Sequence, residues 1–194
     1  MIDAISGALM LTFDDGPDPR GTPAVLDALA RADARATFFV IAPRAAQHPD
    51  LMDRIAAAGH TIGVHCDEHV RHSERDRAWL TIDTERALAR LHRLGILPSL
   101  WRAPWGRSAP WSAEVAASFG LRLVGWDVDT HDWRGDRADA MLSAHHAALA
   151  GGAIVLAHDG IGPGARRTDC AETASFVTLV ADHAAQRDLQ LAGL

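Results

Sequence analysis

Residues 9–17 read LMLTFDDGP, an apolar run that stops at the adjacent carboxylates Asp14 and Asp15 and continues into a Gly-Pro turn. The apolar run is typical of a buried β-strand, and at a strand end neighbouring side chains can address one point from different directions. Two carboxylates this close cannot both stay ionised cheaply without a cation, which suggests one acid bound to a metal and the other free as a base. Taken alone, the doublet is better explained by ordinary turn chemistry, so the downstream sequence decides.

The composition is that of a globular protein of ordinary size. The 194 residues are 48% hydrophobic and 23% charged, which predicts one domain over residues 1–194 with a sizeable core. The net charge of −6, without a basic run, argues against a nucleic-acid partner. The two distant cysteines, Cys66 and Cys170, predict no disulfide framework, and nothing in the sequence indicates the oligomeric state.

The sequence has no segment of membrane-spanning length and no secretory signal. We therefore expect no membrane partner and a cytoplasmic location. A protein whose secretory leader had already been removed would show the same sequence. Secretion is therefore the alternative expectation.

Short apolar runs alternate with amphipathic ones. Strands are expected at residues 8–13, 36–41, 61–64, 99–102, 121–126, 153–157 and 189–191, with helices beginning at residues 22 and 49 and spanning 84–94, 112–119, 136–150 and 172–186. Such alternation builds parallel sheets. Seven strands fit either a barrel or a doubly wound sheet, and in both of them function gathers at the carboxyl ends of the strands.

Polar clusters follow five of the predicted strands. They lie at residues 14–15, 65–69, 102–106, 127–133 and 158–160. Five polar clusters on one rim are hard to explain as solvated loops, so we expect the functional site there. The Gly-rich stretch 159–169, which carries two arginines, is either a mobile lid or a plain connection.

His65 and His69 stand four residues apart, so on one helical turn their imidazoles would face the same way. With a carboxylate from another strand they form a set of two histidines and one carboxylate that leaves room for water. The sequence therefore predicts one divalent metal ion. Zinc is the default, and cobalt, nickel or iron accept the same ligands. Cys66 is interpreted as a small packed side chain rather than a fourth ligand.

Other strand-end residues can supply acid–base chemistry. His158 can act as a general acid, although a buried structural histidine is the alternative, and Asp132 is a candidate to orient it. Arg102 can hold the free aspartate ionised, or it can form an ordinary surface ion pair. The turn at Trp105 can direct a backbone N–H toward a developing oxyanion.

Five short motifs resemble those of the polysaccharide deacetylase family, the NodB-homology domain of carbohydrate esterase family four. They stand in the family's order as TFDDG (12–16), HCDEH (65–69), RAPW (102–105), DTHDW (129–133) and LAHD (156–159). The resemblance implies an α/β fold, a distorted (β/α) barrel with about seven parallel strands, which agrees with the strand count. It also implies a role for individual residues of each motif.

The implied acid–base roles are Asp14 as general base, His158 as general acid, Arg102 as the partner of Asp14 and Asp132 as the partner of His158. The implied binding roles are Asp15, His65 and His69 as metal ligands, the Trp105 amide at the oxyanion, and Trp133 and Leu156 around the acetyl methyl group. Four positions depart from the family's usual residues, and they leave substrate choice and loop shape open: Val64, Cys66, Val70 and Trp105.

The resemblance implies a metal-dependent hydrolase that removes N-acetyl groups from an N-acetylated sugar oligomer or polysaccharide, chitin-like or peptidoglycan-like. The same machinery could instead cleave an O-acetyl ester, as in acetylated xylan, or a small cyclic amide. A third alternative is a glycan-binding module without catalysis, against which the intact Asp14 and His158 argue. Trp101 and Trp126 are expected to pack in the core rather than to bind sugar.

Overall fold

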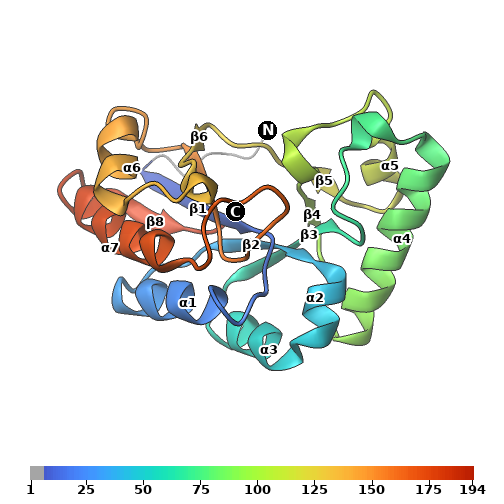
Figure 1. The fold of residues 1–194 in the computed structure, drawn as a ribbon, viewed down its shortest axis with the longest axis horizontal. Coiled ribbons are helices and arrows are strands. Elements are labelled where there is room, and N and C mark those ends of the chain that lie inside the picture. The colour runs from blue at the N-terminus through green and yellow to red at the C-terminus, as the bar shows by residue number, and fades with distance from the viewer. Residues whose placement is uncertain (1–6) are drawn as a thin grey trace.

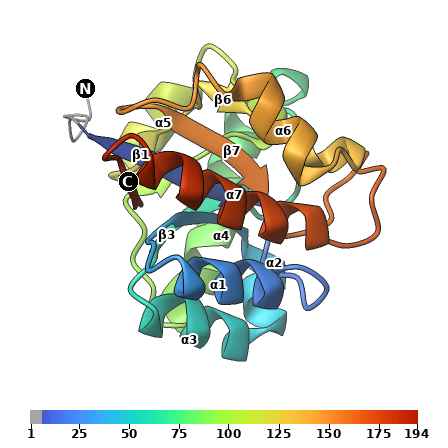
Figure 2. The ribbon, with the colours of Figure 1, turned by 90° about the vertical axis from the view of Figure 1, so that its left-hand side faces the viewer.

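The computed structural model describes residues 7–194, which form one curved parallel sheet with helices packed around it (Figures 1 and 2). Seven strands follow the order β5-β4-β3-β2-β1-β7-β6, and β8 also pairs with β1. The strands are β1 (Ala8–Asp14), β2 (Thr37–Ile41), β3 (Thr61–Cys66), β4 (Leu100–Trp101), β5 (Arg122–Leu123), β6 (Val128–Asp129), β7 (Ile154–His158) and β8 (Gln190–Ala192). The predicted α/β fold, a distorted barrel of about seven parallel strands, is confirmed.

Helices connect the strands and cover the outer face of the sheet. They are α1 (Thr22–Arg31), α2 (Ala42–Gln47), α3 (Pro49–Ala57), α4 (Arg77–Arg93), α5 (Ser112–Ser118), α6 (Ala138–His145) and α7 (Ala171–Ala185). The prediction missed α2, which is too short to show a period, and placed the start of α4 too late. This helix begins after Asp76, whose side chain accepts a hydrogen bond from the backbone N–H of Trp79 at 2.7 Å. Within residues 7–194, no helix has the length and apolarity needed to span a membrane.

The central strand is β1, and all of its residues are buried. On one edge β7 pairs with residues 10–14, while on the other edge β8 pairs with residues 8–10 and β2 with residues 12–14. A strand with neighbours on both edges and helices over it must be apolar along its whole length, which explains the run in residues 8–13. Asp14 ends this strand, so the carboxylate doublet lies at the rim.

The prediction of a strand over residues 121–126 is wrong, because this stretch forms only the short strand β5 and then leaves the sheet edge. The backbone N–H of Val124 still donates to Trp101 (2.8 Å), whereas that of Asp127 donates to Ile154, beside β6 and β7 (2.9 Å). The chain therefore crosses from one edge of the sheet to the other, and no ladder joins β5 to β6 within residues 7–194. The barrel is open at this seam.

Two tryptophans, Trp101 and Trp126, are predicted to lie in the core, and the structure confirms this for only one of them. Trp101 is buried, and its indole N–H donates to the carbonyl of His65 at 2.9 Å, as expected for a core residue. Trp126 lies on the crossing between β5 and β6, is only half-buried and lines a cavity, so the core prediction is wrong there. Cys66 and Cys170 are both free and buried, in agreement with the prediction of no disulfide.

Candidate active site

Asp15, His65 and His69 converge at the carboxyl ends of β1 and β3. One ligand-type atom from each lies within 4.8 Å of the other two. Oδ1 of Asp15 is 3.2 Å from Nε2 of His69 and 3.5 Å from Nε2 of His65. His65 belongs to β3 whereas His69 follows a bend, so the imidazoles meet through a loop and not through the helical turn that their spacing predicted.

These three side chains fit a divalent cation. Oδ1 of Asp15 is buried and has no hydrogen-bond partner among residues 7–194, which is costly unless something else binds it. Burial raises the pKa of Asp15, but the imidazoles of His69, His158 and His65 outweigh it and hold the pKa below its ordinary value. Burial lowers the pKa of His65, which favours the neutral ring that binds metals. Such an Asp-His-His set is typical of a metal site with an open position.

Asp14 forms a buried ion pair with Arg102. Nη1 of Arg102 donates to Oδ1 of Asp14 at 2.9 Å and to the hydroxyl of Thr12 at 2.6 Å. Its other nitrogens donate to the carbonyls of Val124 (3.4 Å) and Gly125 (2.8 Å). Arg102 is completely buried, so the alternative of a surface ion pair is excluded. Burial lowers the pKa of Arg102, and the Asp14 carboxylate opposes that shift.

Asp132 holds His158 at two points. Its Oδ1 lies 2.7 Å from the ring Nδ1 of His158, and its Oδ2 accepts the backbone N–H of the same residue at 2.9 Å. Burial lowers the pKa of His158, but the Asp132 charge raises it to about 9 overall. Burial raises the pKa of Asp132, yet His158 and Arg167 bring it down to about 2. The two side chains therefore form an imidazolium–carboxylate pair.

Arg167 is a site residue that the sequence analysis did not single out. Nη1 donates to Oδ2 of Asp132 at 2.9 Å, beside the hydroxyl of Thr173, which donates to the same oxygen at 2.7 Å. Nη2 donates to the carbonyls of His158 (2.9 Å) and Gly160 (3.2 Å). The available signal was the arginine pair in the Gly-rich stretch, but the sequence does not indicate which arginine turns inward.

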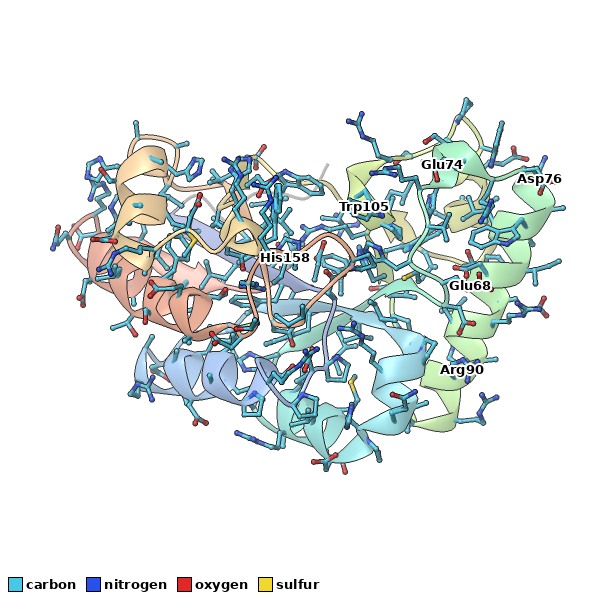
Figure 3. All side chains as sticks on the ribbon, viewed as in Figure 1. Glu68, Glu74, Asp76, Arg90, Trp105 and His158 are labelled. Atoms are coloured by element: carbon cyan, nitrogen blue, oxygen red, sulfur yellow. The ribbon has the colours of Figure 1, made fainter. Side chains whose placement is uncertain are left out.

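A cavity of about 190 Å³ joins these groups. Trp105, which follows β4, and His158, at the end of β7, both line it, and both are labelled in Figure 3. The residues lining it include all three predicted metal ligands and Asp14, together with Trp105, Trp126, Asp129, Trp133, Leu156, His158 and Arg167. The structure thus brings Trp133 and Leu156 to the same cavity as the polar groups.

The Gly-rich stretch after β7 forms one wall of this cavity. Ile161 is anchored on both sides, because its N–H donates to Asp18 (3.2 Å) and its carbonyl accepts from Arg44 (2.8 Å). Gly162 passes so close to Asp15 that an added Cβ would lie 1.9 Å from Oδ2 of that residue. The stretch is therefore anchored at Ile161 and lies directly against Asp15.

Comparison with known proteins identifies the family of this chain. The sequence model of the family described as polysaccharide deacetylase matches residues 3–124. A chitooligosaccharide deacetylase from Bradyrhizobium sp. (strain ANU 289) is 39% identical over 174 residues, which cover 87% of this chain and 77% of that protein. This chain therefore belongs to the polysaccharide deacetylase family, the hydrolases of carbohydrate esterase family four.

Solved structures share the whole architecture. The Bc1960 peptidoglycan N-acetylglucosamine deacetylase superposes with a TM-score of 0.90 at 28% identity, covering 98% of this chain and 87% of that one. A family 4 carbohydrate esterase from Streptomyces lividans, in complex with acetate, superposes with a TM-score of 0.85 at 31% identity, covering 95% and 91%. In each comparison the similarity covers nearly the full length of this chain.

Proposed function

We propose that this protein is a metal-dependent N-deacetylase that removes acetyl groups from an N-acetylated sugar in a chitin-like or peptidoglycan-like glycan. One observation carries the proposal. The same small cavity is lined by Asp15 with its two facing imidazoles, by Asp14 of the buried Asp–Arg pair and by His158 of the His–Asp pair. Relatives named for chitooligosaccharides and for peptidoglycan support this substrate class.

In this proposal, Asp15, His65 and His69 hold one divalent ion. Zinc is the first choice because two imidazoles and one carboxylate, with a position left open, are typical of catalytic zinc. When bound, such an ion supplies a Lewis acid that makes water more acidic and polarises a carbonyl oxygen.

Asp14 acts as the general base that takes the proton from the attacking water. Arg102 donates to this carboxylate at 2.9 Å, so a cation faces it inside the buried site and holds it in place. The backbone N–H of Trp105 helps to hold the oxyanion that develops on the acetyl oxygen. Trp133 and Leu156 form an apolar wall for the acetyl methyl group.

His158 acts as the general acid. The C–N bond breaks with the electron pair going to nitrogen, and an amine is a poor leaving group unless it receives a proton. His158 carries that proton because its pKa is raised to about 9, with burial opposing and the Asp132 carboxylate driving the shift. Asp132 also fixes the orientation of the ring.

Acetate release from a substrate panel tests the proposal. The panel contains chitooligosaccharides, peptidoglycan fragments and acetylxylan, with the metal content measured on the same protein sample. Small cyclic amides are tested beside it by following ring opening, because their hydrolysis releases no acetate. We expect release from the N-acetylated sugars, loss after chelation and recovery with a divalent metal. Preference for acetylxylan would assign an O-acetyl esterase instead, and undiminished turnover in a verified metal-free sample would contradict the metal dependence. Glycan binding without any acetate release would indicate a binding module.

A further inference from the structure

The two histidines of the proposed metal site are held in different ways. Nδ1 of His65 lies 2.8 Å from the carbonyl oxygen of Arg102, which fixes the orientation of its ring. Nδ1 of His69 is buried and has no hydrogen-bond partner in the described part of the chain. Metal-binding histidines usually have a partner for the second ring nitrogen. The orientation of His69 therefore depends on its backbone and its packing.

The carboxylate of Asp83 supplies that backbone support. Asp83 lies on the buried side of α4, with 4% of its surface exposed. Its Oδ2 accepts the backbone N–H of Asp67 at 3.1 Å, and its Oδ1 accepts that of Glu68 at 2.7 Å. Both amides belong to the loop between His65 and His69. One side chain thus fixes two consecutive peptide groups immediately before His69.

A second residue of the same helix holds this loop. Nε of Arg90, two turns further along α4, donates to Oδ1 of Asp67 at 2.7 Å. The backbone N–H of Val70 donates to the carbonyl of Glu68 at 2.8 Å, which tightens the chain around His69. In Figure 3, Glu68 lies beside α4, the helix that carries Arg90. The helix therefore contacts the loop at two points.

Burial of the Asp83 carboxylate costs free energy of desolvation. Within residues 7–194 the side chain of Asp83 forms no ion pair, and its only hydrogen bonds are those that it accepts from the two loop amides. A buried carboxylate without a cation carries a large desolvation cost. Burial raises the pKa of Asp83 to about 6, although both amides act in the opposite direction. The side chain is poorly suited to stabilise the fold and well suited to shape the loop.

We propose that Asp83 is a positioning residue of the metal centre, whose carboxylate holds residues 66–68 in the shape that turns Nε2 of His69 toward Asp15. Asp83 lies outside the five motifs that carry the family resemblance. The inference rests on the proposed metal-dependent function, and it adds a residue of α4 to the support of the site.

The test is the zinc affinity of the metal-free protein, measured by competition with a chromophoric chelator. Asp83→Asn keeps the size of the side chain but loses one of the two acceptor oxygens. We expect its zinc affinity to fall by about tenfold or more, the usual effect of losing a group that supports a metal ligand. Glu85→Gln, an exposed acid on the same helix, and Leu88→Ala, a buried core change there, should stay within about threefold of wild type.

Urea unfolding of the same metal-free samples separates positioning from stability. Wild-type zinc affinity in a folded Asp83→Asn protein would overturn the inference. An equal loss in Leu88→Ala would also overturn it, because general destabilisation would then explain the effect. If Asp83→Asn does not fold, the measurement is made on Asp83→Glu, whose longer side chain displaces the loop; reduced zinc affinity supports the inference and unchanged affinity opposes it.

The experiment also distinguishes failure of the inference from failure of the proposed function. A wild-type protein that binds zinc but releases no acetate would refute the deacetylase and leave the Asp83 measurement valid. A wild-type protein without zinc affinity would overturn both.

Discussion

Asp14 and His158 stand opposite each other as the last register pair of the parallel strands β1 and β7. The backbone N–H of Asp159 donates to the carbonyl of Asp14 at 3.2 Å, which extends the pairing past the strand ends. Sheet geometry therefore sets the spacing of the two residues proposed as base and acid. Neither side chain has to bind the other, and both remain available to a substrate in the cavity.

Asp14→Asn and His158→Ala should each lower kcat for deacetylation by about a hundredfold or more, since each removes one proton-transfer group. Both variants should retain the circular-dichroism spectrum of the wild type. The matched control is His146→Ala, an exposed histidine away from the cavity, which should keep wild-type turnover. Activity within a few-fold of wild type in either variant would remove that residue from the mechanism.

Arg102→Met should destabilise the protein by roughly 3–5 kcal/mol, because it leaves the buried Asp14 carboxylate without its cation. Asp14→Asn in the same protein should restore part of that free energy of unfolding, since the unpaired charge is then gone. Urea unfolding of the wild type, the two single variants and the double variant gives the coupling free energy between Arg102 and Asp14. Strictly additive losses would show that the pair makes no specific contribution.

The pH dependence of kcat should have an alkaline limb near pH 9. The pKa of His158, lowered by burial and raised more strongly by Asp132, is about 9, and only the protonated ring can donate. Activity is therefore lost as the pH rises through that value. Asp132→Asn removes the charge that raises this pKa, so the limb should move to lower pH by about one unit or more. Asp136→Asn, on the same segment, should leave the limb in place.

Gly162→Ala should weaken both metal binding and turnover. The added Cβ would lie 1.9 Å from Oδ2 of Asp15, so either the loop or the carboxylate must move. Gly125→Ala is the control, because a Cβ there meets no atom within 4 Å. Zinc affinity measured by chelator competition should fall only in Gly162→Ala. Equal affinities in the two variants would mean that the loop yields without disturbing Asp15.

Two buried histidines should make the folded state sensitive to acid. Burial lowers the pKa of His60 and of His72 to about 4. An unfolded chain takes up these protons near pH 6.5, so stability decreases as the pH falls from about 6.5 to about 4, by on the order of 2 kcal/mol per histidine. Asp83 and Asp159 act in the opposite direction over the same window, because burial raises the pKa of these acids to about 6 and about 7.

The measured quantity is therefore the difference between variants. The free energy of unfolding is measured with urea at pH 7 and at pH 5. The value at pH 5 minus the value at pH 7 should be lower in the wild type than in His72→Gln. Identical pH differences in the two proteins would show that His72 titrates normally in the folded state.

Much of the site was predictable because its residues stand at the ends of apolar runs. The run before Asp14 and the run before His158 form central strands, and parallel pairing brings their ends to one rim. The stretch at residues 121–126 was misread because a short apolar segment has no feature that separates one strand from an edge strand followed by a crossing. That error concealed Trp126, which the crossing carries to the cavity.

By itself, the amino-acid sequence determined the order of strands and helices and the chemical types available at the rim, because periodicity and strand ends are local properties of the chain. Only the tertiary structure decided which atoms meet. Arg167 reaches Asp132 from a loop 35 residues away, and Asp83 reaches the loop before His69 from the buried side of a helix. Such contacts depend on how the barrel curls and on how the helices rotate against it, and no spacing in the sequence encodes either.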